Sequence, residues 1–274
     1  MSRVAAVDCG TNTIRLLVAD LDPETGAEQE LVREMRVVRL GQDVDRTGRL
    51  ADEALERTFA AIDGYAAVIA EHAVDTVRFC ATSAARDADN AAEFAAGVAS
   101  RLGVEPEVVT GAEEAQLSYD GATRGLAGLD LPAPFLVVDI GGGSTELILG
   151  DGHGHVRSAR SLDIGSVRLT ERCLRVDPPT AEEVREAASV IGKAIDSSDV
   201  PLDSARTVIG VAGTITTVAA GVLGLTRFDR AAIHRAEVAV PDVHALTERL
   251  LAMTVDARRA LPYMHPGRAD VIGA

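Results

Sequence analysis

Asp139-Ile-Gly-Gly-Gly-Ser-Thr-Glu146 carries the strongest structural signal in this 274-residue sequence. The apolar run before it, Phe135-Leu-Val-Val138, predicts a buried strand that ends in the carboxylate of Asp139. The three glycines allow positive φ angles and have no Cβ to obstruct a ligand, so their N–H groups can line a concave anion site. Beyond the two hydroxyls, Glu146-Leu-Ile-Leu149 alternates like a second strand. These parts together suit a phosphate bound with a hard cation.

A similar unit lies near the N-terminus. Residues 3–8 form an apolar run that ends at Asp8, Cys9-Gly-Thr-Asn-Thr13 predicts a turn, and residues 14–19 predict the return strand. Two such units, one in each half of the chain, indicate an internal duplication with two lobes and a cleft between them. Because amphipathic helices such as the one expected over 52–72 alternate with the strands, we predict the α/β class.

The domain boundary is predicted in the Gly-, Leu- and Pro-containing segment that follows residue 124. This gives an N-terminal lobe of residues 1–124 and a C-terminal lobe of residues 125–274. The sequence stops within an apolar, helix-like pattern over 268–274, so we expect the second lobe to lack its last elements.

Composition argues against nucleic acid as a partner. The formal net charge is −15, there is no Trp, and aromatic residues make up 3% of the chain. A nucleic-acid backbone would be repelled, and stacking platforms for single strands are scarce. Any anionic substrate must therefore be held by local arginines or by a metal ion.

Cysteine usage and hydropathy predict a cytoplasmic protein with no membrane segment. Cys9, Cys80 and Cys173 are odd in number and widely spaced, which favours small buried thiols over a disulfide framework. The N-terminus runs directly into a strand and lacks a signal-peptide pattern. The weakly charged stretch from Val208 to Leu225 contains glycines and threonines in a strand-turn-helix pattern and is interpreted as core.

Two further candidates follow from local patterns. Arg86 follows the predicted strand Val77–Ala81 on a loop at the edge where open α/β sheets bind ligands, although an ordinary exposed arginine would look the same. Glu114 stands in the first turn of a helix that Thr110 and Glu113 already cap. Glu114 is therefore available for a catalytic role, or it is a solvated acid that the helix dipole stabilises.

An arginine stripe is predicted on the helix that follows Gly165. Arg168, Arg172 and Arg175 have helical spacing and lie on one face, where they could guide an anionic chain. Because Glu171 is interleaved, a solvated helix face is an equally good interpretation.

Six blocks taken together resemble the exopolyphosphatase and guanosine pentaphosphate phosphohydrolase family. They occur in that family's order and cover nearly the whole chain: Asp8-Cys-Gly-Thr-Asn-Thr-Ile-Arg15, Ala81-Thr-Ser-Ala-Ala-Arg86, Gly111-Ala-Glu-Glu-Ala115, Asp139 to Glu146, Gly165-Ser-Val-Arg168 and Gly210-Val-Ala-Gly-Thr214. The resemblance implies the actin-like ATPase superfamily, with two duplicated ribonuclease-H-like lobes, mixed five-stranded sheets and an interlobe cleft. The chain is similar to the short two-domain members.

The resemblance and the residue chemistry together give the expected roles. Glu114 would orient the attacking water and Arg86 would clamp a phosphoryl oxygen. Asp8, Asp139 and Glu146 would hold Mg²⁺, with Mn²⁺ as a second possibility, although acids at strand ends are often plain turn residues. The expected phosphate-binding residues are Gly10, Thr11, Asn12, Gly141, Gly142, Gly143, Ser144, Gly213, Thr214 and Arg168.

The resulting expectation is a Mg²⁺-dependent hydrolase that releases terminal orthophosphate from inorganic polyphosphate. Three alternatives remain at this point: hydrolysis of the 5′ γ-phosphate of guanosine pentaphosphate, an actin-like kinase, and a non-catalytic sensor of polyphosphate or alarmone. A homodimer is a further possibility.

Overall fold

The chain divides into two compact units, Met1–Thr110 and Gly111–Ala274. The computed structural model describes residues 2–22, 24–126 and 128–274. The boundary predicted after residue 124 lies at the end of helix α5 (Gly111–Arg124), whereas the two units divide at the start of this helix. This helix belongs to the second unit because its buried residues Ala115 and Tyr119 pack into the core of the second sheet.

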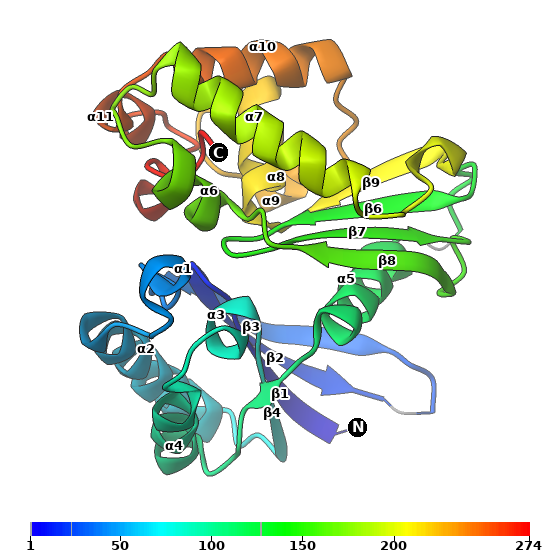
Figure 1. Ribbon diagram of the computed structural model, residues 1–274. Helices are drawn as coiled ribbons and strands as arrows, with labels where there is room; N and C mark the ends of the chain where they lie inside the picture. Colours follow the sequence, from blue (N-terminus) through cyan, green and yellow to red (C-terminus); the bar gives the residue numbers. More distant parts are fainter. Residues whose placement is uncertain (1, 23, 127) are drawn as a thin grey trace. The chain divides into compact units, whose positions relative to one another are not determined.

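The first unit is a mixed five-stranded sheet with helices. Its sheet has the order β3-β2-β1-β4-β5, in which β1 to β3 are antiparallel and β4 and β5 run parallel to β1 (Figure 1). Its elements are β1 (Ser2–Cys9), β2 (Thr13–Leu21), β3 (Glu28–Val37), α1 (Val44–Thr47), α2 (Asp52–Glu71), β4 (Thr76–Ala81), α3 (Ser83–Arg86), α4 (Ala91–Leu102) and β5 (Glu107–Val108).

The core of the first unit lies between one face of this sheet and the pair α2 and α4. Alternate residues of β1, such as Val7 and Cys9, point into it because side chains on a strand alternate between faces. From α2, Ile62 and Tyr65 enter the same core, and the Tyr65 hydroxyl donates to the Ile14 carbonyl at 3.0 Å. The helical spacing of these apolar residues is thus explained by burial on one face.

The second unit repeats the strand order of the first. Its sheet runs β8-β7-β6-β9, with β6 to β8 antiparallel and β9 parallel to β6, which matches β3-β2-β1-β4 strand for strand. Its elements are α5, β6 (Phe135–Ile140), β7 (Thr145–Gly150), β8 (Val156–Leu162), α6 (Ser166–Cys173), α7 (Ala181–Asp196), β9 (Thr207–Val211), α8 (Ala212–Val222), α9 (Arg230–Ile233), α10 (Val240–Leu251) and α11 (Val255–Arg259).

This repetition confirms the α/β class and the duplication. One detail differs, because the second sheet has four strands among the described residues where five were expected. The β6 and β7 strands are buried on both faces: Val137 and Ile148 pack with α5, whereas Leu136 and Leu147 belong to the core on the opposite face. Figure 1 shows α5 alongside β7 and β8.

Residues 268–274, whose apolar pattern resembled that of a helix, do not form an α-helix in the structure. Pro266–Arg268 forms a single 3-10 turn, and further turns follow. The Arg258 guanidinium donates to the carbonyl of Ala269 at 3.1 Å, so a backbone acceptor in this segment is satisfied by a side chain. The apolar pattern arises because Val271 and Ile272 are buried.

The structure tests two further expectations, the absence of a membrane-spanning helix and the burial of the cysteines. Among the described residues, no helix combines the length and apolar character that crossing a membrane would need. All three cysteines are free thiols, and Cys9 and Cys173 are buried. Burial raises the pKa of both of these thiols, which makes them poor nucleophiles.

Candidate active site

The two glycine-containing turns have the same backbone geometry. In the second unit the Gly141 N–H donates to the Ser144 carbonyl at 3.0 Å, and in the first the Gly10 N–H donates to the Thr13 carbonyl at 3.0 Å. Each turn joins the two strands of a hairpin at the same register. The duplication predicted from sequence therefore extends to individual hydrogen bonds.

The carbonyl groups of the glycine turn in the second unit all bond to the start of α6. The Gly141 carbonyl accepts from the N–H of Ser166, and the Gly142 carbonyl accepts from the N–H groups of the next two residues. The Gly143 carbonyl accepts from the Gly165 N–H at 3.2 Å. Because C=O and N–H point in opposite directions across a trans peptide, the N–H groups of Gly142, Gly143 and Ser144 face away from α6. These three N–H groups therefore lie on the side of the turn opposite α6.

Arg168 supports this turn from the α6 side. Its Nε donates to the Gly143 carbonyl at 2.8 Å, and its side chain is 11% exposed and lies 3.8 Å from Asp163. The arginine stripe is likewise engaged within the unit, because Arg175 pairs with Glu186 at 3.1 Å and Arg172 bonds to the Asp163 carbonyl. These contacts favour a helix face that bonds to neighbouring groups of its own unit over a surface that guides an anionic chain.

Gly165 fits against the turn in a way that no other residue could. A Cβ on Gly165 would lie 2.4 Å from the backbone carbon and oxygen of Gly142. Its φ of −84° and ψ of 163° are accessible to any residue, so contact with the turn rather than backbone strain requires glycine here.

Three acids gather beside the turn within the second unit. Asp139 and Glu146 are directly opposite each other on β6 and β7, and Glu146 is only 1% exposed. Burial, followed by the negative charge of Glu114 and then that of Asp139, raises the pKa of Glu146 to about 8. The negative charge of Glu114 on α5 thus acts on Glu146 beside the turn.

Two serines that sequence analysis did not select bond to these acids. The Ser118 hydroxyl donates to Asp139 Oδ2 at 2.5 Å, and the Ser161 hydroxyl donates to Glu146 Oε1 at 2.7 Å. The Ser144 hydroxyl also donates to Glu146 and, like Ser161, opposes the rise in its pKa. Ser118 follows Glu114 by four residues on α5, and this helical spacing was the one sequence signal that could have selected it.

The acid pair suits a magnesium ion. Within the described ranges, no group of three or more His, Cys, Asp or Glu side chains converges in a way that could hold a metal. Mg²⁺ does not need one, because it commonly takes one or two carboxylates and completes its shell with water and substrate phosphates. The Asp139–Glu146 pair, whose charges repel each other, meets this requirement.

In the first unit, the predicted metal ligand Asp8 and the predicted catalytic residue Arg86 both have partners within the unit. Asp8 lies 3.4 Å from Arg15, which occupies the register position that Glu146 has in the second unit. Arg86 donates to the Val109 carbonyl at 2.8 Å.

The first turn also places polar groups in a buried setting. The hydroxyl of Thr11 bonds to that of Ser83 at 2.9 Å. Asn12 is 5% exposed, and neither amide atom of its side chain has a hydrogen-bond partner in the described structure. A buried amide in this state is expected to bond to a ligand or to water.

Gly213 and Thr214 lie in the first turn of α8. A Cβ on Gly213 would collide with the Arg268 guanidinium, so the glycine admits this arginine. Thr214 is 7% exposed and its hydroxyl has no partner among the described groups. Gly213 thus borders the buried guanidinium of Arg268.

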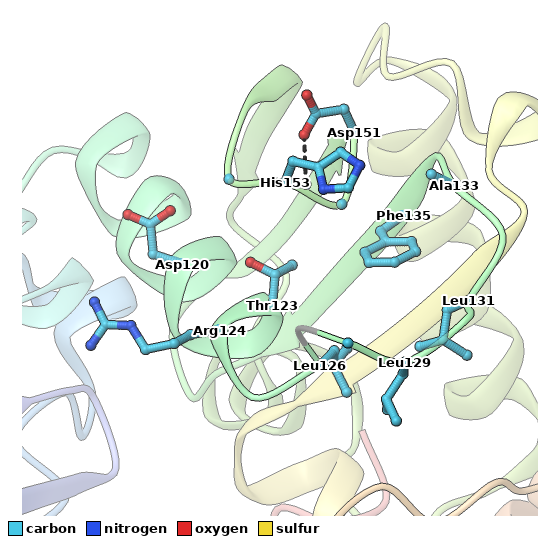
Figure 2. A pocket seen from close by; sticks show the side chains of 13 residues that line it. Asp120, Thr123, Arg124, Leu126, Leu129, Leu131, Ala133, Phe135, Asp151 and His153 are labelled. Carbon is cyan, nitrogen blue, oxygen red and sulfur yellow. Dashed lines mark hydrogen bonds between the residues drawn. The ribbon is translucent and has the colours of Figure 1, made fainter. Parts of the chain in front are cut away.

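A separate pocket of about 480 Å³ lies at the other end of β6. Figure 2 shows its apolar floor, which includes Leu131 and Phe135, and charged groups at its edge, among them Asp120, Arg124 and Asp151. Phe135 begins the strand whose other end carries Asp139, so the pocket is distinct from the glycine turn.

The repeated hairpin-and-parallel-strand topology, with a glycine turn beside an acid pair in the second unit, defines a duplicated α/β protein with mixed sheets. Residues 18–274 match the family described as the Ppx/GppA phosphatase family. Exopolyphosphatase 2 of Mycobacterium tuberculosis is 49% identical over 282 residues, which cover 100% of this chain and 87% of that protein.

Two crystal structures extend the comparison. An exopolyphosphatase-like protein superposes with a TM-score of 0.94 at 48% identity, covering 99% of this chain and 84% of the other. The Ppx/GppA family member of Aquifex aeolicus superposes with a TM-score of 0.79 at 32% identity, covering 99% and 86%. The chain therefore belongs to the Ppx/GppA phosphatase family. Within that family it is a hydrolase of phosphoanhydride bonds.

Proposed function

We propose that this protein is a Mg²⁺-dependent exopolyphosphatase that releases terminal orthophosphate from inorganic polyphosphate. The observation that carries the proposal is that Glu114 and Glu146 lie close together in one unit, beside a turn whose N–H groups face away from α6. The negative charge of Glu114 raises the pKa of Glu146. The 49% identity to an exopolyphosphatase supports the choice of polyphosphate.

Glu114 is assigned the general base. Hydrolysis of a phosphoanhydride requires a positioned water and neutralisation of charge on the phosphoryl oxygens. The N–H groups of Gly142, Gly143 and Ser144 would bind those oxygens, in the manner of other backbone nests. Glu114 would accept a proton from the attacking water as the new bond to phosphorus forms, and the shortened polyphosphate would leave.

Asp139 and Glu146 are assigned to the metal ion. When bound there, Mg²⁺ would neutralise phosphoryl charge and favour the ionised form of Glu146. Arg168 is assigned to support of the turn, because its guanidinium bonds to the Gly143 carbonyl. The contributions of Asp8, Gly10, Thr11, Asn12, Arg86, Gly213 and Thr214 stay predictions from sequence.

Guanosine pentaphosphate is the second candidate substrate, because the matched family joins two kinds of phosphatase under one description. Substrate choice is tested by measuring orthophosphate release from long-chain polyphosphate, short-chain polyphosphate and guanosine pentaphosphate side by side. Each reaction is run with Mg²⁺, with Mn²⁺ and with EDTA. The proposal expects the highest kcat/KM on polyphosphate and no release in EDTA.

Two results would reject the proposal. Release only from guanosine pentaphosphate would assign the protein to the second substrate. Undiminished release in EDTA would remove the metal from the mechanism. Production of ADP from ATP in the presence of an acceptor serves as the control for kinase activity.

A further inference from the structure

Each acid of the Asp139–Glu146 pair accepts a hydrogen bond from a serine on a different element. Ser118 reaches Asp139 from helix α5, at 2.5 Å. Ser161 reaches Glu146 from strand β8, at 2.7 Å. The two acids are therefore fixed by two uncharged groups, one from helix α5 and one from the neighbouring strand β8.

A hydroxyl donor bonded to one carboxylate oxygen restricts rotation of the whole group. A carboxylate has about four acceptor sites, so one serine leaves capacity for a cation on the same group. Carboxylates that bind metals are themselves hydrogen-bonded in most sites, and those outer partners determine the orientation of the ligands. Because the side-chain rotamers of both acids are already restricted, their oxygens can bind one ion with a smaller loss of conformational entropy.

The packing of Gly111 limits the freedom of Ser161 itself. A Cβ on Gly111 would lie 2.8 Å from the Cβ and 3.4 Å from the Oγ of Ser161. Glycine at the first residue of α5 thus lets the helix approach β8 at the point where Ser161 donates to Glu146.

We propose that Ser118 and Ser161 are positioning residues that hold Asp139 and Glu146 in one joint orientation for a divalent cation. The inference rests on the proposed function for the identity of the metal site, and it adds two residues that act through the acids and do not touch the substrate.

The test measures metal binding in the absence of substrate. Mn²⁺, as a probe for Mg²⁺, is titrated by calorimetry into wild type, Ser118→Ala, Ser161→Ala and Gly111→Ala. Ser118→Thr retains the hydroxyl and serves as the rescue variant. Ser158→Ala is the matched control, because Ser158 lies three residues earlier on β8 and hence on the opposite face. Thermal midpoints are measured in EDTA for every variant.

Loss of an outer partner is expected to raise the dissociation constant for Mn²⁺ by about 10-fold or more in Ser118→Ala and Ser161→Ala. A smaller rise is expected in Gly111→Ala, and values close to wild type in Ser118→Thr and Ser158→Ala. A purely structural role would lower the thermal midpoint in EDTA and leave metal affinity unchanged.

The outcomes separate this inference from the proposed function. Equal Mn²⁺ affinity in wild type and both alanine variants would overturn the inference, as would a wild type that binds no Mn²⁺. If Mn²⁺ binds wild type more tightly than both serine-to-alanine variants, and wild type nevertheless releases no phosphate from polyphosphate, the inference stands and the proposed substrate fails.

Discussion

Asp139 lies directly opposite Glu146 across the β6–β7 hairpin, whereas the same register position in the first unit pairs Asp8 with Arg15. The duplicated turns are therefore alike in backbone and unlike in charge. In the first unit the acid has a cation 3.4 Å away, while in the second two acids face each other with Glu146 buried. A like-charged buried pair is stabilised by a bound cation, which is why we assign the metal to the second unit.

Glu114→Gln is expected to abolish hydrolysis and to preserve substrate binding. The amide retains the shape of the side chain but cannot accept a proton from water, so kcat should fall by about 100-fold or more. Phosphate release and polyphosphate binding are measured in parallel, with Glu113→Gln as the neighbouring control. An unchanged kcat would exclude Glu114 as the base.

Glu146 gives the metal-free protein a pH-dependent stability. Its folded-state pKa of about 8 is above the ordinary 4.5 because of burial, so the folded state retains a proton that the unfolded state releases between these values. The contribution of Glu146 to stability is therefore fully present below about pH 4.5 and is lost as the pH rises through about 8.

The corresponding measurement compares thermal midpoints of wild type and Glu146→Gln in EDTA from pH 5 to pH 8. The midpoint of wild type should fall relative to that of the variant as the pH rises. Mg²⁺ should reduce this difference, because a bound cation favours the ionised carboxylate. Parallel curves for the two proteins would contradict the assignment of the raised pKa to Glu146.

Gly165→Ala should disrupt the turn without straining its own backbone. The added Cβ would lie 2.4 Å from the Gly142 carbonyl group, which must move. We expect a lower thermal midpoint and a higher KM for polyphosphate. Gly121→Ala on α5 is the control, since a Cβ there has no neighbour within 4 Å and should add up to about 1 kcal/mol through helix propensity. Wild-type kinetics in Gly165→Ala would show that the turn does not bind substrate.

Arg168→Ala distinguishes support of the turn from direct contact with phosphate. Losing the bond from Nε to the Gly143 carbonyl should cost about 1.5–3 kcal/mol, so the thermal midpoint should fall even in the absence of substrate. Arg172→Ala serves as a stripe control from the same helix. A substrate-free midpoint equal to wild type, together with a raised KM, would instead favour direct contact.

The local pattern of the chain was sufficient to predict the two hairpins and their relation. Apolar runs that end in Asp8 and Asp139, each followed by a turn, indicated the duplication, and the strand order confirms it. Strand period and turn chemistry depend on residues near each other in sequence, which is why these features could be predicted. The placement of α5 could not, because the helix joins the second unit through the burial of Tyr119 and Ala115.

Sequence alone thus determined the acids, the glycine turn and the helix that carries Glu114. Only tertiary structure decided that Arg168 bonds to the back of the turn, that Gly165 must lack a side chain, and that Ser118 and Ser161 hold the acid pair. Each of these relations joins elements distant in sequence, and a hydrogen bond of less than 3 Å depends on how those elements pack. The local sequence therefore determined which side chains the site contains, whereas the packing of distant elements determined how those side chains are oriented.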